Sequence, residues 1–365
     1  MTAWQRRFPL ALIVCSLVAL VVINATMGTP STGQPSASTP STGPSSPAPS
    51  LADFSDPVPR MAIVYDLGGR GSAGFNELAW EGAKRAADAF GAELKEVTAR
   101  PGDTQADREQ SLKELADAHY DPIFVIGSTY AHAVAKVAPT YPGTWFGLVD
   151  DGSVDAKNVI GILFNEEQGS FLVGAAAALT SKTGTVGFIG LVNTPPLQKL
   201  EAGFAAGARA ANPKVKVRVA YLSRPTDVVV PQDPAKAREA ALAMYDASAD
   251  VIYEAAGDAG SGVIEAAHDR GRWAISASGD EYLTADPSVR GAILTSMLTR
   301  ADVATYIIAM EVASGVPKDG NNVFGLDRGG VGYATSGGFV DPIKTQLDAF
   351  AARIASGKIL VPTKP

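Results

Sequence analysis

A glycine-rich stretch near the start of the folded region has the spacing of a phosphate-binding turn. Residues 69–74 read G-x-G-x-x-G, between an apolar run at 61–66 and a helical pattern at 75–90. In that setting, backbone N–H groups and a helix N-terminus can bind the pyrophosphate of a dinucleotide. The acid expected about 20 residues later does not clearly end the second strand. A structural strand-to-helix turn and a ligand-contacting turn in a binding protein therefore stay open as alternatives.

The sequence offers little material for catalysis or metal binding. It contains neither a G-x-S-x-G nor an H-E-x-x-H pattern. Its three histidines, His119, His132 and His268, are far apart, and its single cysteine, Cys15, lies in an N-terminal apolar run. We predict no catalytic residue, no metal site and no resident cofactor.

The surrounding pattern predicts an α/β fold. Short apolar runs alternate with segments whose apolar residues recur at helical spacing. Such alternation is typical of parallel sheets covered by helices on both faces. We expect strands at 61–66, 92–99, 122–127, 144–150, 158–164, 185–191, 215–222, 250–256, 273–279, 292–298 and near 323–334, and helices at 75–90, 105–119, 198–211, 234–247, 260–270, 301–314 and 342–356.

A break at 181–184 divides this alternation into two halves. We predict that lobe 1 comprises 58–165 plus about 300–360, and that lobe 2 comprises 166–299. The carboxyl ends of the strands of both lobes would then border one cleft, where ligands of open α/β sheets bind. Hinge closure around a ligand is the usual motion of this arrangement.

Composition and charge restrict the class of protein further. The 365 residues carry a net charge of −7, which disfavours a nucleic-acid-binding body because such a body needs a basic face. One cysteine excludes a disulfide framework.

The first 57 residues are predicted to lie outside the fold. Residues 1–25 combine two arginines with an apolar run, as in a signal or membrane anchor. An uncleaved anchor, a cleaved signal and a lipoprotein modified on Cys15 are all compatible with it. Residues 26–57 are rich in Pro, Ser, Thr and Gly, which predicts a flexible tether. Each version places the body outside the cytoplasm. A flexible tether behind a membrane segment predicts a module held at the outer face of the cytoplasmic membrane.

Several segments resemble the basic membrane protein family of transporter substrate-binding lipoproteins, which includes purine nucleoside receptors. The resemblance extends from about 61 to 340, and its order and spacing are specific. It is carried by the segments 74–82 (GFNELAWEG), 158–174 (NVIGILFNEEQGSFLVG), 182–190 (KTGTVGFIG), 250–267 (DVIYEAAGDAGSGVIEAA) and 294–306 (LTSMLTRADVATY).

This resemblance implies a two-lobed periplasmic-binding-protein fold (class I) that captures a nucleoside-like solute for an ABC permease. It implies that Phe75 stacks on a base, that the Asn76 amide binds a base edge and that Asp150 faces the cleft. Structural roles stay open for all three: a core contact for Phe75, a helix cap for Asn76 and turn chemistry for Asp150.

Further candidate contacts come from strand ends and from departures from the family pattern. Gly127, Ser128 and Gly257 end strands that face the predicted cleft, where close backbone approach to a ligand is the expected role. The remaining candidates lie in family motifs that this sequence alters. Ser72 begins the segment that replaces the family's Asp-Lys-Ser, and Thr299 replaces a lysine. Ser278 replaces the aspartate that grips ribose in the family, whereas Asp280 keeps the second aspartate of that motif.

These departures weaken the case for an ordinary nucleoside, because a carboxylate and an ammonium that would grip ribose hydroxyls are both replaced. We hypothesise a solute-binding protein whose ligand is a nucleoside or a related purine or pyrimidine compound. A membrane-tethered sensor without transport, a dinucleotide-dependent enzyme using 69–74 and a scaffold that no longer binds a ligand are the alternatives.

Overall fold

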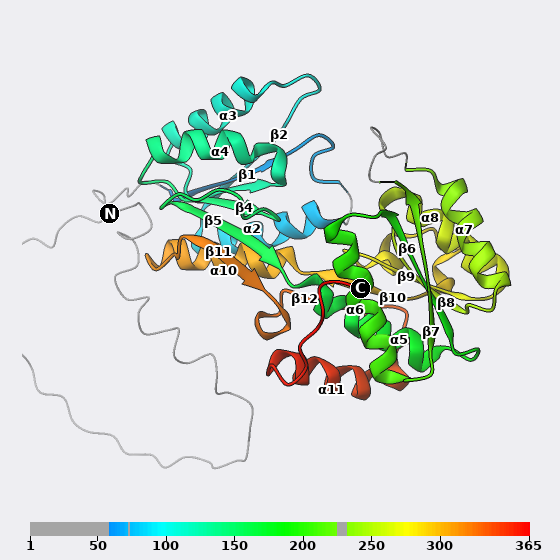
Figure 1. Cartoon of the computed structure of the whole chain (residues 1–365). Coiled ribbons are helices and arrows are strands. Elements are labelled where there is room, and N and C mark those ends of the chain that lie inside the picture. Colours follow the sequence, from blue (N-terminus) through cyan, green and yellow to red (C-terminus); the bar gives the residue numbers. More distant parts are fainter. Residues whose placement is uncertain (1–57, 72–73, 225–231) are drawn as a thin grey trace, which may run out of the picture.

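The computed structural model describes residues 58–71, 74–224 and 232–365, which form two α/β lobes (Figure 1). The predicted signal or anchor, the predicted tether and Ser72 lie outside the described residues. Within the described part of the chain, no helix is both long enough and apolar enough to cross a membrane.

The first lobe is built on a six-stranded sheet in which every neighbouring pair is parallel, in the order β11-β5-β4-β3-β1-β2. Helices α2 and α10 cover one face of this sheet, and α3 and α4 cover the other (Figure 1). The bounds are β1 Arg60–Tyr65, α2 Phe75–Phe90, β2 Glu93–Thr98, α3 Gln105–Asp117, β3 Ile123–Ile126, α4 Ala131–Val137, β4 Phe146–Val149, β5 Val159–Phe164, α10 Ala301–Ala313 and β11 Gly320–Phe324.

The second lobe repeats this plan with the strand order β12-β10-β9-β8-β6-β7, in which only the β10–β12 pair is antiparallel. Helices α5, α6 and α11 lie on one face of this sheet, and α7 and α8 lie on the other. The bounds are α5 Glu166–Thr180, β6 Thr185–Val192, α6 Pro195–Ala211, β7 Lys216–Ser223, α7 Pro234–Asp246, β8 Val251–Ala255, α8 Gly260–Arg270, β9 Trp273–Ser276, α9 Glu281–Thr284, β10 Ile293–Thr299, β12 Val331–Tyr333 and α11 Lys344–Ala355.

The two mostly parallel sheets flanked by helices confirm the predicted fold class. The continuous apolar runs arise because central strands such as β3 and β4 are buried at every position. This burial on both faces is what distinguishes a parallel sheet from a half-exposed antiparallel one.

The chain passes between the lobes three times: from β5 to α5, from β10 to α10 and from β11 to β12. The carboxyl-terminal region therefore divides between the lobes, which differs from the expectation that about 300–360 completes lobe 1. Helix α10 and strand β11 join lobe 1, but β12 pairs with β10, and Leu347 of α11 is buried in the core of lobe 2. The single strand expected near 323–334 is interrupted by a turn in which Gly329 has a φ of 68°.

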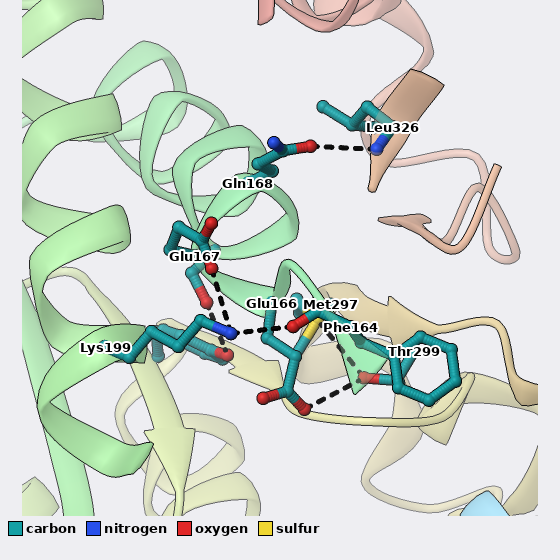
Figure 2. Close-up of polar contacts among 10 residues, drawn as sticks. Phe164, Glu166, Glu167, Gln168, Lys199, Met297, Thr299 and Leu326 are labelled. Carbon is teal, nitrogen blue, oxygen red and sulfur yellow. Dashed lines mark hydrogen bonds and ion pairs between the residues drawn. The ribbon is translucent and has the colours of Figure 1, made fainter. Parts of the chain in front are cut away.

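Hydrogen bonds hold the three crossings together. The Asn165 N–H donates to the Phe324 carbonyl at 3.1 Å, and the Arg300 N–H donates to the Gly330 carbonyl at 2.8 Å. The Leu326 N–H donates to the Gln168 side-chain oxygen at 2.8 Å (Figure 2). All three segments thus form one connected hinge region.

Candidate ligand-binding site

A polar cavity of about 600 Å³ lies between the lobes. Lobe 1 contributes the loop after β1 and the start of α2, and lobe 2 contributes residues after β8 and in α9. Its lining consists of Leu67, Gly68, Gly69, Arg70, Gly71, Gly74, Phe75, Asn76, Asp258, Glu281 and Thr284.

The glycine-rich turn takes its shape from backbone that favours glycine. Gly68, Gly69 and Gly71 have φ values of 97°, 65° and 70°, in the region that side chains disfavour. The Asn76 amide nitrogen donates to the Gly69 carbonyl at 2.7 Å, which fixes the turn against the first turn of α2. Gly74, rather than Asn76, is the residue that precedes the helix as its N-cap. Asn76 therefore braces the turn and also lines the cavity.

Phe75 connects the cavity to the core. Its ring meets the ring of Phe164 edge to face, with centroids 5.8 Å apart, and Phe164 lies 6.2 Å from Phe324. Phe75 remains partly exposed and lines the cavity. The two interpretations offered by the sequence are therefore compatible, because the ring packs against Phe164 while the residue still borders the cavity.

Arg70 is a cavity residue that the sequence did not single out. Its guanidinium lies over the Trp80 ring at 4.1 Å from the centroid, and its Nε is 2.9 Å from a Glu77 carboxylate oxygen. A second carboxylate, that of Glu96, lies 3.5 Å away. These contacts hold the arginine against lobe 1 and leave its charge paired.

Two strand ends of lobe 1 carry the next candidates. Gly127 follows β3 with a φ of 87°, and Ser128, the next residue, is exposed. Asp150 follows β4 with a φ of 64°, and its side chain is exposed although the surrounding protein raises the pKa of its carboxyl, with Lys199 opposing that rise.

Glu166, at the start of α5 in the hinge region, interacts electrostatically with Asp150. Burial and the nearby Asp150 raise the pKa of Glu166 to about 7, whereas Lys199 and Thr299 lower it. The Thr299 hydroxyl donates to Glu166 Oε1 at 3.4 Å, so the side chain links the first crossing to the second (Figure 2).

Lys199 of α6 is committed to neighbouring groups (Figure 2). Its Nζ donates to the Phe164 carbonyl at 2.7 Å and lies 3.1 Å from Glu167 Oε2. The sequence did not identify Glu166 or Lys199 as candidates. The change from strand to helix at Asn165 is the signal that could have indicated Glu166, because it marks the crossing between the lobes on which Glu166 lies.

The lobe 2 candidates are mostly held by their own lobe. Gly257 has a φ of 58°. Ser278 has a φ of 75°, and its carbonyl accepts the Thr299 N–H at 3.3 Å. Asp280 accepts a hydrogen bond from the Ser336 hydroxyl. Thr299 is 1% exposed.

The structure thus brings Phe75 and Asn76 into the interlobe cavity. Thr299 hydrogen-bonds to Glu166, and Asp150 interacts with Glu166 electrostatically. The sequence missed the lobe 2 side of the cavity, which is formed by Asp258, Glu281 and Thr284. Burial and the neighbouring Asp280 raise the pKa of Glu281. Across the described residues, no group of three or more His, Cys, Asp and Glu side chains is placed to hold a metal ion.

Comparisons with known proteins agree with this architecture. The chain is 32% identical over 324 residues to the CD4+ T-cell-stimulating antigen of Listeria monocytogenes, covering 84% of this chain and 88% of that one. It is 28% identical to the ABC transporter nucleoside-binding protein BmpA of Lactococcus lactis, covering 84% and 89%. A solved solute-binding protein of an ABC transporter system from Aeropyrum pernix superposes with a TM-score of 0.62 at 26% identity, covering 84% of this chain and 94% of that one.

The family model described as ABC transporter substrate-binding protein PnrA-like matches residues 60–364, which include both lobes and all three crossings. The chain therefore belongs to the Bmp family of ABC transporter substrate-binding proteins.

Proposed function

We propose that this protein is the extracytoplasmic receptor of an ABC importer and that its ligand is a nucleoside or a related purine or pyrimidine compound. The observation that carries the proposal is the interlobe cavity with Phe75 on its wall. A volume of about 600 Å³ suits a small organic ligand. A partly exposed aromatic ring beside amide and carboxylate groups suits a flat heterocycle with polar edges.

Capture would occur by closure of the lobes. Leu67 is 56% exposed on the lobe 1 side of the cavity, and Leu283, next to Thr284 on the lobe 2 side, is 68% exposed. Closing the cleft would remove this apolar surface from water and so favour the closed state once a ligand fills the cavity. The three hydrogen-bonded crossings supply a common axis for that motion.

Delivery to a membrane permease and tethering by the N-terminal segment complete the proposal. The relative named a nucleoside-binding protein of an ABC transporter supports the ligand class. Relatives named as lipoproteins support attachment to the outer face of the cytoplasmic membrane.

Thermal unfolding of the full-length chain in mild detergent tests the ligand class. A ligand at 100 times its dissociation constant stabilises the folded state by about 2.7 kcal/mol, which raises the melting temperature by roughly 5 °C. We expect such a shift with at least one nucleoside or base. Phe75→Ala should abolish the shift, whereas Phe90→Ala, at the opposite end of α2, should retain it. A panel of nucleosides, bases and dinucleotides in which only a dinucleotide produces a shift would overturn the proposal.

A further inference from the structure

One edge of lobe 2 carries positive charge that the neighbouring sequence does not balance. Between Glu201 and Asp227 the chain contains five basic residues and no acidic one, although its net charge is −7. A second stretch, after Asp348, contains three basic residues and again no acidic one. Two stretches far apart in the sequence thus share an excess of positive charge.

The fold brings these two stretches together at β7, the last strand of its sheet. A groove there is lined by Arg209 of α6, by Val219 of β7 and by Lys364 of the carboxyl-terminal segment. Figure 1 shows that segment running from α11 to the side of α6. The acidic residue of the lining, Glu201, is already engaged, because its Oε2 accepts a hydrogen bond from the Tyr221 hydroxyl at 2.6 Å.

The face of β7 opposite this groove is basic as well. Lys216 and Arg218 are two residues apart on the strand, so their side chains point to the same face, and both are exposed. Lys214 precedes the strand, and Lys182 lies in the turn whose Gly184 carbonyl accepts the Lys216 N–H at 2.9 Å. We call the six exposed basic residues around this strand the basic edge: Lys182, Arg209, Lys214, Lys216, Arg218 and Lys364.

No side chain of the basic edge forms an ion pair with another described residue. The edge strand β2 of lobe 1 is different. It carries Lys95 between two glutamates, and Glu93 Oε2 lies 2.9 Å from Arg60 Nε. The excess of positive charge is therefore a property of lobe 2 and not of edge strands in this protein generally.

Protection of the strand itself does not explain the basic edge. Lysine and arginine on an edge strand hinder pairing with another chain. That role accounts for Lys216 and Arg218, which lie on β7. It does not account for the other four residues, which lie on α6, in two connecting segments and in the carboxyl-terminal segment.

We propose that the basic edge of lobe 2 contacts the anionic phospholipid headgroups of the membrane to which the chain is tethered. This inference goes beyond solute capture, and it rests on the membrane attachment in the proposed function. Anionic headgroups attract clustered lysine and arginine side chains, and salt screens that attraction over about 10 Å at 0.1 M ionic strength. Val219 is 42% exposed beside the basic residues and adds apolar surface to the contact.

The attachment point favours the membrane as the partner. The predicted tether ends at residue 57, directly before the first described residue, Val58. A random coil of the length of 26–57 has a root-mean-square end-to-end distance of roughly 30 Å. A body held at that distance meets the headgroups at a high effective concentration, so that individually weak charge contacts suffice to orient it.

Hydrogen exchange of the full-length protein locates the contact. The protein is reconstituted into nanodiscs of phosphatidylcholine alone, or of phosphatidylcholine and phosphatidylglycerol in equal parts, at about 0.1 M salt. We expect the backbone amides of 209–219 to exchange at least about two-fold more slowly in the anionic nanodiscs, and this difference to disappear at high salt because the contact is electrostatic. The amides of β2, at the balanced edge of lobe 1, should exchange equally in both.

Charge reversal tests the cause of the slowing. Combined Lys214→Glu, Lys216→Glu and Arg218→Glu should abolish it, because the edge would then repel the headgroups. Combined Arg209→Glu and Lys214→Glu leaves β7 unaltered and takes the place of the triple variant should that variant fail to fold.

A matched control separates the basic edge from net charge. Combined Lys95→Glu, Lys157→Glu and Lys318→Glu alters three exposed lysines of lobe 1 and changes the net charge by the same amount. This variant should retain the slower exchange of 209–219 in anionic nanodiscs. Loss of the slowing in this control would show that total charge governs the contact and would overturn the assignment to the basic edge.

The remaining outcomes distinguish this inference from the proposed function. Equal exchange in both nanodiscs, with the protein attached to both, would overturn the lipid contact and leave attachment and solute capture intact. Slowing by soluble polyglutamate but not by anionic nanodiscs would assign the edge to an acidic protein surface and overturn the lipid partner. Failure of the chain to attach to either nanodisc would overturn both the attachment and the inference.

Discussion

The two sides of lobe 2 are packed in opposite ways. One side is the interface between α5 and α6, called the rear below. These helices approach so closely that a Cβ added to Gly207 would lie 1.9 Å from the Phe171 carbonyl oxygen. A Cβ on Gly203 would lie 2.2 Å from the Glu167 carbonyl oxygen. The other side is helix α9 beside the interlobe cavity, called the front rim below. All four residues of α9 are at least partly exposed.

This difference separates rigidity from movement. Backbone-to-backbone contact at the rear leaves no space for relative motion of α5 and α6, so lobe 2 should move as one body. The residues of α9 are instead at least partly exposed at every position, as expected of a surface that must meet a ligand and the opposite lobe. The following predictions test how strictly the two sides differ.

The largest effect should come from the rear. Gly207→Ala places a methyl group within 1.9 Å of a backbone oxygen, which only a displacement of α5 or α6 can relieve. We expect a loss of about 3 kcal/mol or more in the free energy of unfolding, measured by urea denaturation. Gly143→Ala is the control, because within the described residues its added Cβ meets no heavy atom within 4 Å. Equal losses in the two variants would contradict the tight packing.

The carboxylate at the hinge should make stability depend on pH. Because burial raises the pKa of Glu166 from 4.5 to about 7, the folded state holds a proton that the unfolded state releases. The associated stability is present below pH 4.5 and is lost as the pH rises through 7, with a total of up to about 3 kcal/mol.

Denaturation between pH 4.5 and pH 7.5 measures this effect. Glu166→Gln should flatten the decline, whereas Thr299→Val should steepen it, because the threonine hydroxyl lowers the pKa of Glu166. Identical pH profiles for wild type and Glu166→Gln would show that the carboxylate titrates normally.

A smaller effect is expected where the cleft meets lobe 1. Asn76→Ala removes the 2.7 Å hydrogen bond to the Gly69 carbonyl and should cost about 1 kcal/mol of stability. It should also weaken ligand binding, because the freed turn lines the cavity. Chemical denaturation and isothermal titration measure the two effects. Reduced affinity with unchanged stability would indicate that Asn76 contacts the ligand without bracing the turn.

Local patterns predicted the fold better than they predicted the site. The apolar run at 122–127 identified β3, because burial on both faces leaves a signal in consecutive residues. Phe75 and Asn76 were named because the segment 74–82 resembles the family pattern, and the cavity lining includes both. Glu166 was missed because its character depends on Asp150, Lys199 and Thr299, which reach it from three other elements. The three-residue strand β12 was also not distinguished from β11 in the sequence, because only residues 325–330 separate the two strands.

The smallest effect on stability should come from the front rim. Leu283 is 68% exposed, so Leu283→Ser should change the free energy of unfolding by less than about 0.5 kcal/mol. If Leu283 is buried when the lobes close, the same change should weaken ligand-induced compaction, measured as the decrease in radius of gyration by small-angle X-ray scattering. Val316→Ser, at an exposed position after α10, is the matched control. Unaltered compaction in Leu283→Ser would mean that closure does not bury this rim, and that the exposed leucine contributes neither to folding nor to capture.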